Sequence, residues 1–148
     1  MPLHSYVSDE LRLLVATRAN LLCEYCLIHE EDTFTGCQVE HIISRKHSGA
    51  TELHNLAFAC VYCNRYKGSD IATLKPGSDQ LVRFFNPRTD KWFDHFRHNQ
   101  AIIEYLSEIG EATSRILRFN DSDRILEREE LIQIGRYPVA EAIKRMQP

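Results

Sequence analysis

Two Cys-x-x-Cys pairs are the residues of this sequence with the clearest chemistry. Cys23 and Cys26 form the first pair, and Cys60 and Cys63 form the second pair after an intervening stretch, residues 27–59. Four thiolates complete a tetrahedral ligand set for Zn²⁺, and a site closed by four protein ligands is structural rather than catalytic. The alternative is four buried free thiols or a redox pair, which two matching pairs disfavour. The sequence therefore predicts one structural zinc ion that contributes directly to folding.

Glu40, His41 and Asn64 are candidates for a second site with different chemistry. His41 is a candidate general base because an imidazole titrates near neutral pH, although a lone His is more often structural. Alternation along a strand would send Glu40 and His41 to opposite faces, so a twist or bulge would be needed to bring both to one site. Asn64 follows the second Cys pair, which suits a metal ligand, but an Asn at a helix start is more often a cap.

The order of these residues resembles a known family. Glu40-His41, Asn55 and Cys63-Asn64-x-x-Lys67-Gly68 are similar to the motif of HNH endonucleases, whose module is called the ββα-metal or His-Me finger. Downstream, Phe85-Asn86-Pro87-Arg88 and Trp92-x-x-His95-Phe96 resemble the extension of a group of small bacterial, zinc-containing HNH proteins. The resemblance implies an α+β fold with a ββα-metal core, an N-terminal helix and a helical C-terminal extension.

The resemblance also implies roles for single residues. His41 would be the base that takes a proton from water, and Asn64 would bind one catalytic divalent ion. Glu40 stands where the family usually has Asp as a second ligand of that ion. Asn55 would hold the loop between two β segments so that His41 faces the phosphate. The ion would be Mg²⁺ or Mn²⁺, separate from the zinc, and hydrolysis would leave a 5′ phosphate.

The distribution of charge says more about partners than its sum. The net charge of −3 does not indicate a nucleic-acid binder. The segment from His41 to Lys75, however, contains five Lys or Arg residues and only two acidic residues. Phosphate contacts would give affinity without base specificity, and a solvated surface charge is an equally good interpretation for any single residue. The candidate phosphate contacts are Arg45, Lys46, Arg65 and Lys67.

Length and composition predict one domain. The 148 residues, 43% hydrophobic and 26% charged, suit a single domain 1–148 with a core over about 21–75 and an extension over about 81–148. The N-terminus has no signal-peptide pattern, and no run of ~18 apolar residues occurs. We therefore expect a cytoplasmic protein without a membrane partner. The fifth cysteine, Cys37, is expected to be a small buried residue.

Local patterns predict the elements that position these residues. Ser8 is an N-cap candidate, Lys75-Pro76-Gly77-Ser78 is a turn, and the aromatic residues over 90–96 are expected to pack on the motif. The expected helices lie over residues 9–20, after Cys63, from Ser107 to about 119, and over 120–134. The expected strands lie over residues 38–43, 53–60, 81–85 and 101–106.

Three functions fit these observations. The first is a metal-dependent DNA endonuclease, with RNA as an open alternative substrate and a homodimer where both strands must be cut. The second is an inactive zinc-stabilised module that binds nucleic acid or protein. The third is a structural zinc domain whose helical tail docks a partner. A degenerate module has no need of His41 or Asn64, so the presence of both favours the endonuclease.

Overall fold

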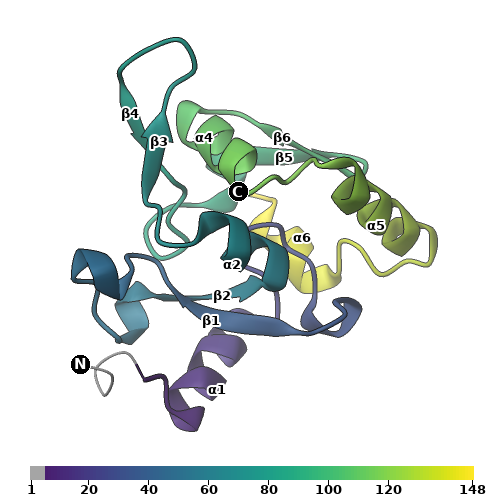
Figure 1. Ribbon diagram of the computed structural model, residues 1–148. Helices are drawn as coiled ribbons and strands as arrows, with labels where there is room; N and C mark the ends of the chain where they lie inside the picture. Colours follow the sequence, from purple (N-terminus) through teal and green to yellow (C-terminus); the bar gives the residue numbers. More distant parts are fainter. Residues whose placement is uncertain (1–5) are drawn as a thin grey trace.

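The centre of the fold is a β-hairpin followed at once by a helix, as seen in a computed structural model that describes residues 6–148 (Figure 1). Strands β1 (Cys37–His41) and β2 (Leu56–Cys60) pair antiparallel along their full lengths. Helix α2 (Val61–Lys67) begins directly after β2, with Cys60 as its N-cap. Together with the helices and small antiparallel sheets elsewhere, this ββα unit confirms the predicted α+β class.

Helices cover the hairpin on both sides. Helix α1 (Asp9–Arg18) lies on one side and α2 on the other (Figure 1). Ser8 caps α1 by accepting a hydrogen bond from the Leu11 N–H, and the two acids of the first turn suit the positive end of the helix dipole. All five residues of β2 are buried because both faces are covered. The cluster between α1 and the hairpin consists of Val15, Ala19, Leu56 and Phe58.

Two element boundaries near the motif differ from expectation. The strand predicted over 53–60 begins only at Leu56, because Leu53–Asn55 form a 3-10 turn. The helix predicted after Cys63 already begins at Val61, because the Cys60 sulfur caps it. It ends before Gly68, whose φ of +52° suits glycine.

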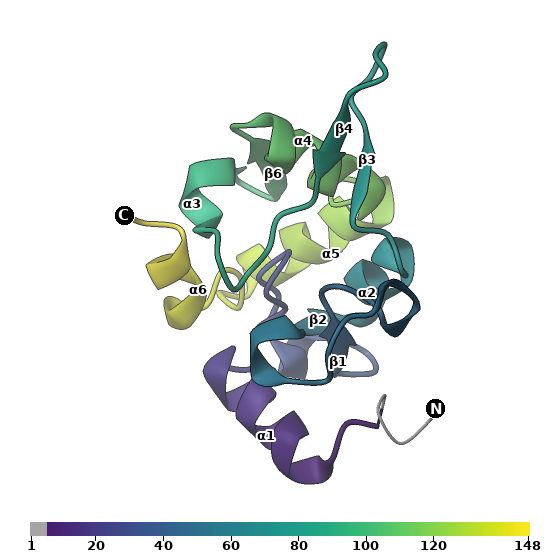
Figure 2. The ribbon, with the colours of Figure 1, turned by 90° about the vertical axis from the view of Figure 1, so that its left-hand side faces the viewer.

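Beyond residue 70 the chain forms two further hairpins and four helices. Figure 2 shows that the first of these hairpins projects away from the body of the molecule. The elements are β3 (Ala72–Leu74), β4 (Leu81–Arg83), α3 (Trp92–His95), β5 (Phe96–Asn99), β6 (Ile102–Tyr105), α4 (Glu108–Ile116), α5 (Ser122–Gln133) and α6 (Ala140–Arg145).

The longer elements of this extension confirm the sequence prediction. Ser107 caps α4, and α5 ends close to Gly135, whose φ is +75°. Strands β4 and β6 are found within the predicted segments, and the predicted turn joins β3 to β4. Sequence analysis missed β3, α3, β5 and α6, which are short. The longest helix between residues 6 and 148, α5, has 12 residues, and no described helix has the length and apolarity to span a bilayer.

The extension and the Cys pairs share one hydrophobic core. The main cluster contains the four paired cysteines together with aromatic residues of the extension, among them Trp92, Phe96, Phe119 and Tyr137. The aromatic segment over 90–96 therefore packs on the motif, as predicted. Cys37 is only partly buried and packs at the edge of the core, so the prediction of a buried residue was wrong.

Candidate metal centre and candidate active site

The four paired cysteines bring their sulfurs into one cluster. Each sulfur lies within 4.8 Å of the other three, and all four side chains are buried. The distance between Cys26 Sγ and Cys60 Sγ is 3.7 Å. In a tetrahedral site with Zn–S bonds of about 2.3 Å, neighbouring sulfurs lie about 3.8 Å apart. The donor set, its spacing and its burial fit a structural Zn²⁺ ion held by Cys23, Cys26, Cys60 and Cys63.

Each Cys pair folds a backbone N–H back onto its first sulfur. The N–H of Cys26 lies 3.5 Å from Cys23 Sγ, and the N–H of Cys63 lies 3.5 Å from Cys60 Sγ. Such donors favour the charged form of a thiol. Burial raises the pKa of Cys23 well above its ordinary value. A bound cation would therefore stabilise the full set of thiolates at neutral pH.

Sequence analysis missed a cation at this centre. Arg124 of α5 places Nη2 3.3 Å from Cys63 Sγ and 3.7 Å from Cys60 Sγ. Burial alone would lower the pKa of this guanidinium, but the cysteine sulfurs hold it above its ordinary value. No local motif marks Arg124, which is 61 positions from Cys63. The one signal was the pair of Arg124 and Arg128, which share a helix face at a spacing of four.

His41 and Asn64 line one shallow cleft of about 290 Å³ beside the hairpin. His41 is the last residue of β1, and its Nε2 lies 2.9 Å from Thr51 Oγ1. Asn64 lies in α2, and its Nδ2 donates to Gln38 Oε1 at 2.6 Å. These contacts engage one polar atom of each side chain and leave His41 Nδ1 and Asn64 Oδ1 as the atoms with other chemistry to offer. The cleft is lined by Val39, Glu40, His41, Ser44, Arg45, Asn64, Gly68 and Ser69.

The electrostatics of the cleft favour a neutral imidazole. Burial lowers the pKa of His41, and the positive charges of Arg45 and Lys67 lower it further. An unperturbed His is already mostly neutral at pH 7, so this shift leaves the ring able to accept a proton.

Asn55 fastens the loop that follows His41. Its Oδ1 accepts a hydrogen bond from the Ile43 N–H at 2.9 Å, and its Nδ2 donates to the carbonyl oxygens of Ile43 at 2.8 Å and Ala50 at 2.9 Å. The loop is so tight that a Cβ at Gly49 would lie 1.7 Å from the Ile43 carbonyl oxygen. Asn55 thus forms hydrogen bonds with backbone groups at the start of the loop, at Ile43, and near its end, at Ala50.

The carboxylate of Glu40 is buried and already has partners inside the protein. Its side chain is 5% exposed, its carboxylate pairs with Lys67 Nζ at 3.2 Å, and it accepts a hydrogen bond from the Tyr25 hydroxyl. The regular register of β1 with β2 keeps strand alternation intact, so Glu40 and His41 point to opposite faces. In this structure Glu40 is a buried carboxylate engaged by Lys67 and Tyr25, although the residue also lines the cleft, and its role as a second ligand of the catalytic ion stays a prediction.

Lys67 is internal as well, which corrects its assignment as a phosphate contact. Its side chain is 2% exposed, and its Nζ donates to the carbonyl oxygens of Ile42 at 2.8 Å and His41 at 3.3 Å. The ammonium group therefore fixes the end of β1 from inside. The three other candidate phosphate contacts are exposed, and one of them, Arg45, lines the cleft: Arg45, Lys46 and Arg65.

The geometry defines a class of protein: a ββα unit with a His on the first strand, an Asn on the helix and a four-cysteine centre at its base. Residues 23–70 match the family described as HNH endonuclease. The chain thus contains an HNH domain over these residues, of the type with a candidate zinc site, and its extension lies outside the match. No curated protein and no solved structure matches the chain significantly.

Proposed function

We propose that this protein is a metal-dependent endonuclease that hydrolyses phosphodiester bonds in DNA. The observation that carries the proposal is the shared cleft of His41 and Asn64, which come from different elements of the HNH domain. In a hydrolase of this kind, the general base and the metal ligand must lie close to the same scissile phosphate. A binding module does not require these two side chains to lie in one cleft. A cytoplasmic location and pairing of two copies stay predictions.

His41 acts as the general base. The contact of Nε2 with Thr51 orients the ring. We assign to His41 the tautomer with the proton on Nε2, in which Nδ1 carries the lone pair that takes a proton from the attacking water. Burial and the two nearby positive charges lower the pKa of His41 and keep Nδ1 unprotonated at neutral pH. Asn55 holds the adjoining loop and thereby the position of the ring.

Asn64 offers its Oδ1 to one divalent cation. The hydrogen bond from Nδ2 to Gln38 orients the amide so that the oxygen remains for the metal. A single protein ligand suits Mg²⁺, which keeps several of its waters, and Mn²⁺ accepts the same oxygen donors. When bound, such an ion polarises the phosphate and stabilises the leaving 3′ oxygen. Arg45, at the cleft, contacts the DNA backbone together with Lys46 and Arg65.

A catalytically inactive zinc-stabilised binding module is the second candidate. The specific observation that favours it is the pairing of Glu40 with Lys67, which engages the carboxylate nearest to Asn64 along the lining of the cleft. Such a module would bind nucleic acid or protein through the same exposed basic residues. It would not depend on the His41 imidazole.

Plasmid nicking by purified protein tests the proposal. We expect nicking with Mg²⁺ or Mn²⁺, none with EDTA, and a loss of about 10²–10⁴-fold in His41→Ala, the range for removal of a general base. His54→Ala is the matched control, because the His54 side chain is 71% exposed and lies outside the cleft. Equal inertness of wild type and His41→Ala on single-stranded and duplex DNA would support the binding module. RNA cleavage that requires His41 would keep the mechanism and change the substrate.

A further inference from the structure

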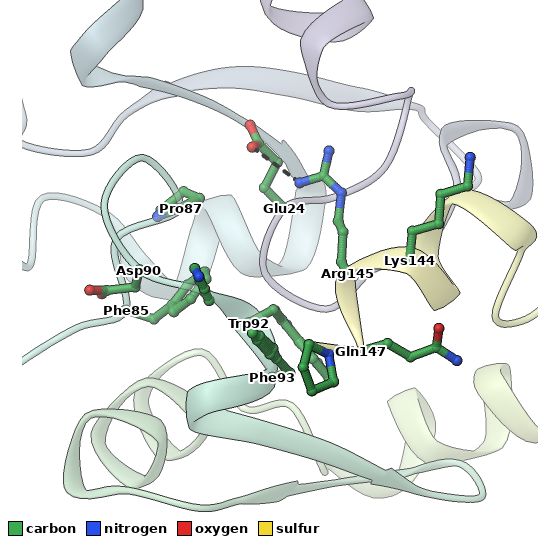
Figure 3. A pocket seen from close by; sticks show the side chains of 11 residues that line it. Glu24, Phe85, Pro87, Asp90, Trp92, Phe93, Lys144, Arg145 and Gln147 are labelled. Atoms are coloured by element: carbon green, nitrogen blue, oxygen red, sulfur yellow. Dashed lines mark ion pairs between the residues drawn. The ribbon is translucent and has the colours of Figure 1, made fainter.

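The extension contacts both halves of the metal centre, and all of these contacts come from outside the HNH match. On the first Cys pair, the Tyr137 hydroxyl donates to the Cys26 carbonyl oxygen at 2.8 Å, and Trp92 Nε1 donates to the Tyr25 carbonyl oxygen at 2.8 Å. Figure 3 shows Arg145 of α6 reaching Glu24, with an ion pair of 3.7 Å. These contacts hold the backbone of the first pair in place.

The second Cys pair receives a charged contact. Arg124 of α5 is buried, and its Nη2 lies 3.3 Å from Cys63 Sγ and 3.7 Å from Cys60 Sγ. Its other terminal nitrogen, Nη1, donates to the carbonyl oxygens of Leu117 at 2.8 Å and Arg118 at 3.3 Å. The guanidinium is thus fixed by backbone on one side and faces sulfur on the other.

A buried cation needs a partner, and the anionic groups to which the Arg124 guanidinium donates are the sulfurs of Cys60 and Cys63. Four thiolates around one Zn²⁺ carry a net negative charge, which is costly in a buried site. A guanidinium that donates to two of the four sulfurs offsets that charge and stabilises the thiolate form of both. The HNH match brings no cation to this place, because Arg124 lies beyond residue 70.

We propose that Arg124 is the counter-cation of the four-cysteine metal centre, and that the extension raises the affinity of this centre for Zn²⁺. Zinc binding and docking of α5 are therefore coupled: each stabilises the other. This inference does not depend on nuclease activity, because it concerns the metal affinity of the folded protein.

Arg128 provides a matched control on the same helix. It is buried like Arg124, at 2% exposed against 3%, but its guanidinium donates to the carbonyl oxygens of Ala101 at 2.6 Å and Phe119 at 2.7 Å and has no sulfur partner among residues 6–148. Substituting either arginine removes a buried cation from α5. A general loss of stability would affect both variants, whereas a loss specific to the metal would affect only one.

The test is competition for Zn²⁺ between each folded variant and a chromophoric chelator. We expect Arg124→Met to weaken Zn²⁺ affinity about 10–100-fold relative to Arg128→Met, the range for loss of an outer partner of a metal ligand. Arg124→Lys, which keeps the charge, should lie between Arg124→Met and wild type. Affinities of Arg124→Met and Arg128→Met within about threefold of each other would overturn the proposal.

A measurement on the unmodified chain covers the case in which Arg124→Met does not fold. Wild-type protein loaded with ¹¹³Cd²⁺ should show a scalar coupling between the metal and an Arg124 guanidinium proton, transmitted through the Cys63 sulfur. The exposed guanidinium of Arg97 should show none. Arg124 guanidinium protons that exchange with water as fast as those of Arg97 would contradict the proposal.

Discussion

The metal centre and the His41 cleft lie in one small domain but are built in opposite ways. The four sulfurs are buried, and contacts from the HNH unit and from the extension enclose them on several sides. The cleft is shallow and is lined only by residues 39–69 of the HNH unit. A closed site fixes structure, whereas an open site leaves room for substrate and for water on a metal. The contrast teaches that the extension serves the first site and leaves the second one free.

A chain of direct contacts joins these two regions. Tyr25 lies between the cysteines of the first pair, and its hydroxyl donates to Glu40. Glu40 pairs with Lys67, whose Nζ also donates to the carbonyl oxygen of His41. The position of the His41 backbone, and with it that of the imidazole, therefore depends on the folded state of the metal centre.

Removal of two sulfurs should have the largest effect. In the double variant Cys60→Ser, Cys63→Ser we expect zinc content to fall from about one ion per chain to none and the cooperative unfolding transition to disappear, because structural zinc contributes ~10 kcal/mol or more. Elemental analysis and thermal unfolding are the measurements. Cys37→Ser is the control, since Cys37 is outside the sulfur cluster and should keep its zinc. A double variant that unfolds like wild type would refute the structural role of the metal.

The second-largest effect is expected from loss of Lys67, the internal cation that links the two regions. Lys67→Met leaves Glu40 buried without its partner, which typically costs about 3–5 kcal/mol in the free energy of unfolding. Adding Glu40→Gln should recover most of that loss, because the uncompensated charge is then gone. Urea denaturation measures both, with exposed Lys46→Met as control. A Lys67→Met effect no larger than that of Lys46→Met would mean that the ion pair is not a link.

A smaller effect is expected at Asn55. Asn55→Ala leaves the Ile43 N–H and two carbonyl oxygens without their partner, at a cost of about 1–3 kcal/mol in the free energy of unfolding. Because the change is confined to the loop beside His41, nicking activity should fall while zinc content stays unchanged. Asn55→Asp keeps the acceptor for the Ile43 N–H but places a carboxylate oxygen against the carbonyl oxygens of Ile43 and Ala50, so it should cost at least as much stability as Asn55→Ala. Loss of zinc in Asn55→Ala would show that the loop beside His41 cannot be disturbed without disturbing the zinc site.

The smallest of these effects is expected on the pH dependence of nicking, when a charge near His41 is removed. Only the neutral imidazole accepts a proton, so activity should rise with pH, and the lowered pKa of His41 places the midpoint below its ordinary value of 6.5. Arg45→Gln removes one of the charges that lower this pKa and should move the midpoint upward. Lys46→Gln, which changes the same charge at a residue outside the cleft, should leave it in place. A midpoint that moves downward in Arg45→Gln would contradict the role of His41.

Local signals could be read from the sequence, and long-range ones could not. The sulfur cluster follows from two short motifs, and the starts of α1 and α4 follow from the caps Ser8 and Ser107, because these patterns involve residues within a few positions of each other. The contact of Arg124 with Cys63 joins positions 61 residues apart and has no periodic signature. The ion pair of Lys67 with Glu40 joins positions 27 residues apart, and in the sequence alone Lys67 resembles a surface charge.

One assay separates the roles of the two metals in a single preparation. Protein with one Zn²⁺ per chain, freed of other metals, should not nick plasmid until Mg²⁺ is added. Its zinc content should be the same before and after the reaction, and its His41→Ala variant should keep the zinc and lose the activity. Nicking by the zinc-loaded protein without Mg²⁺ or Mn²⁺, abolished when the zinc is removed, would contradict the division between a structural centre and an open catalytic cleft.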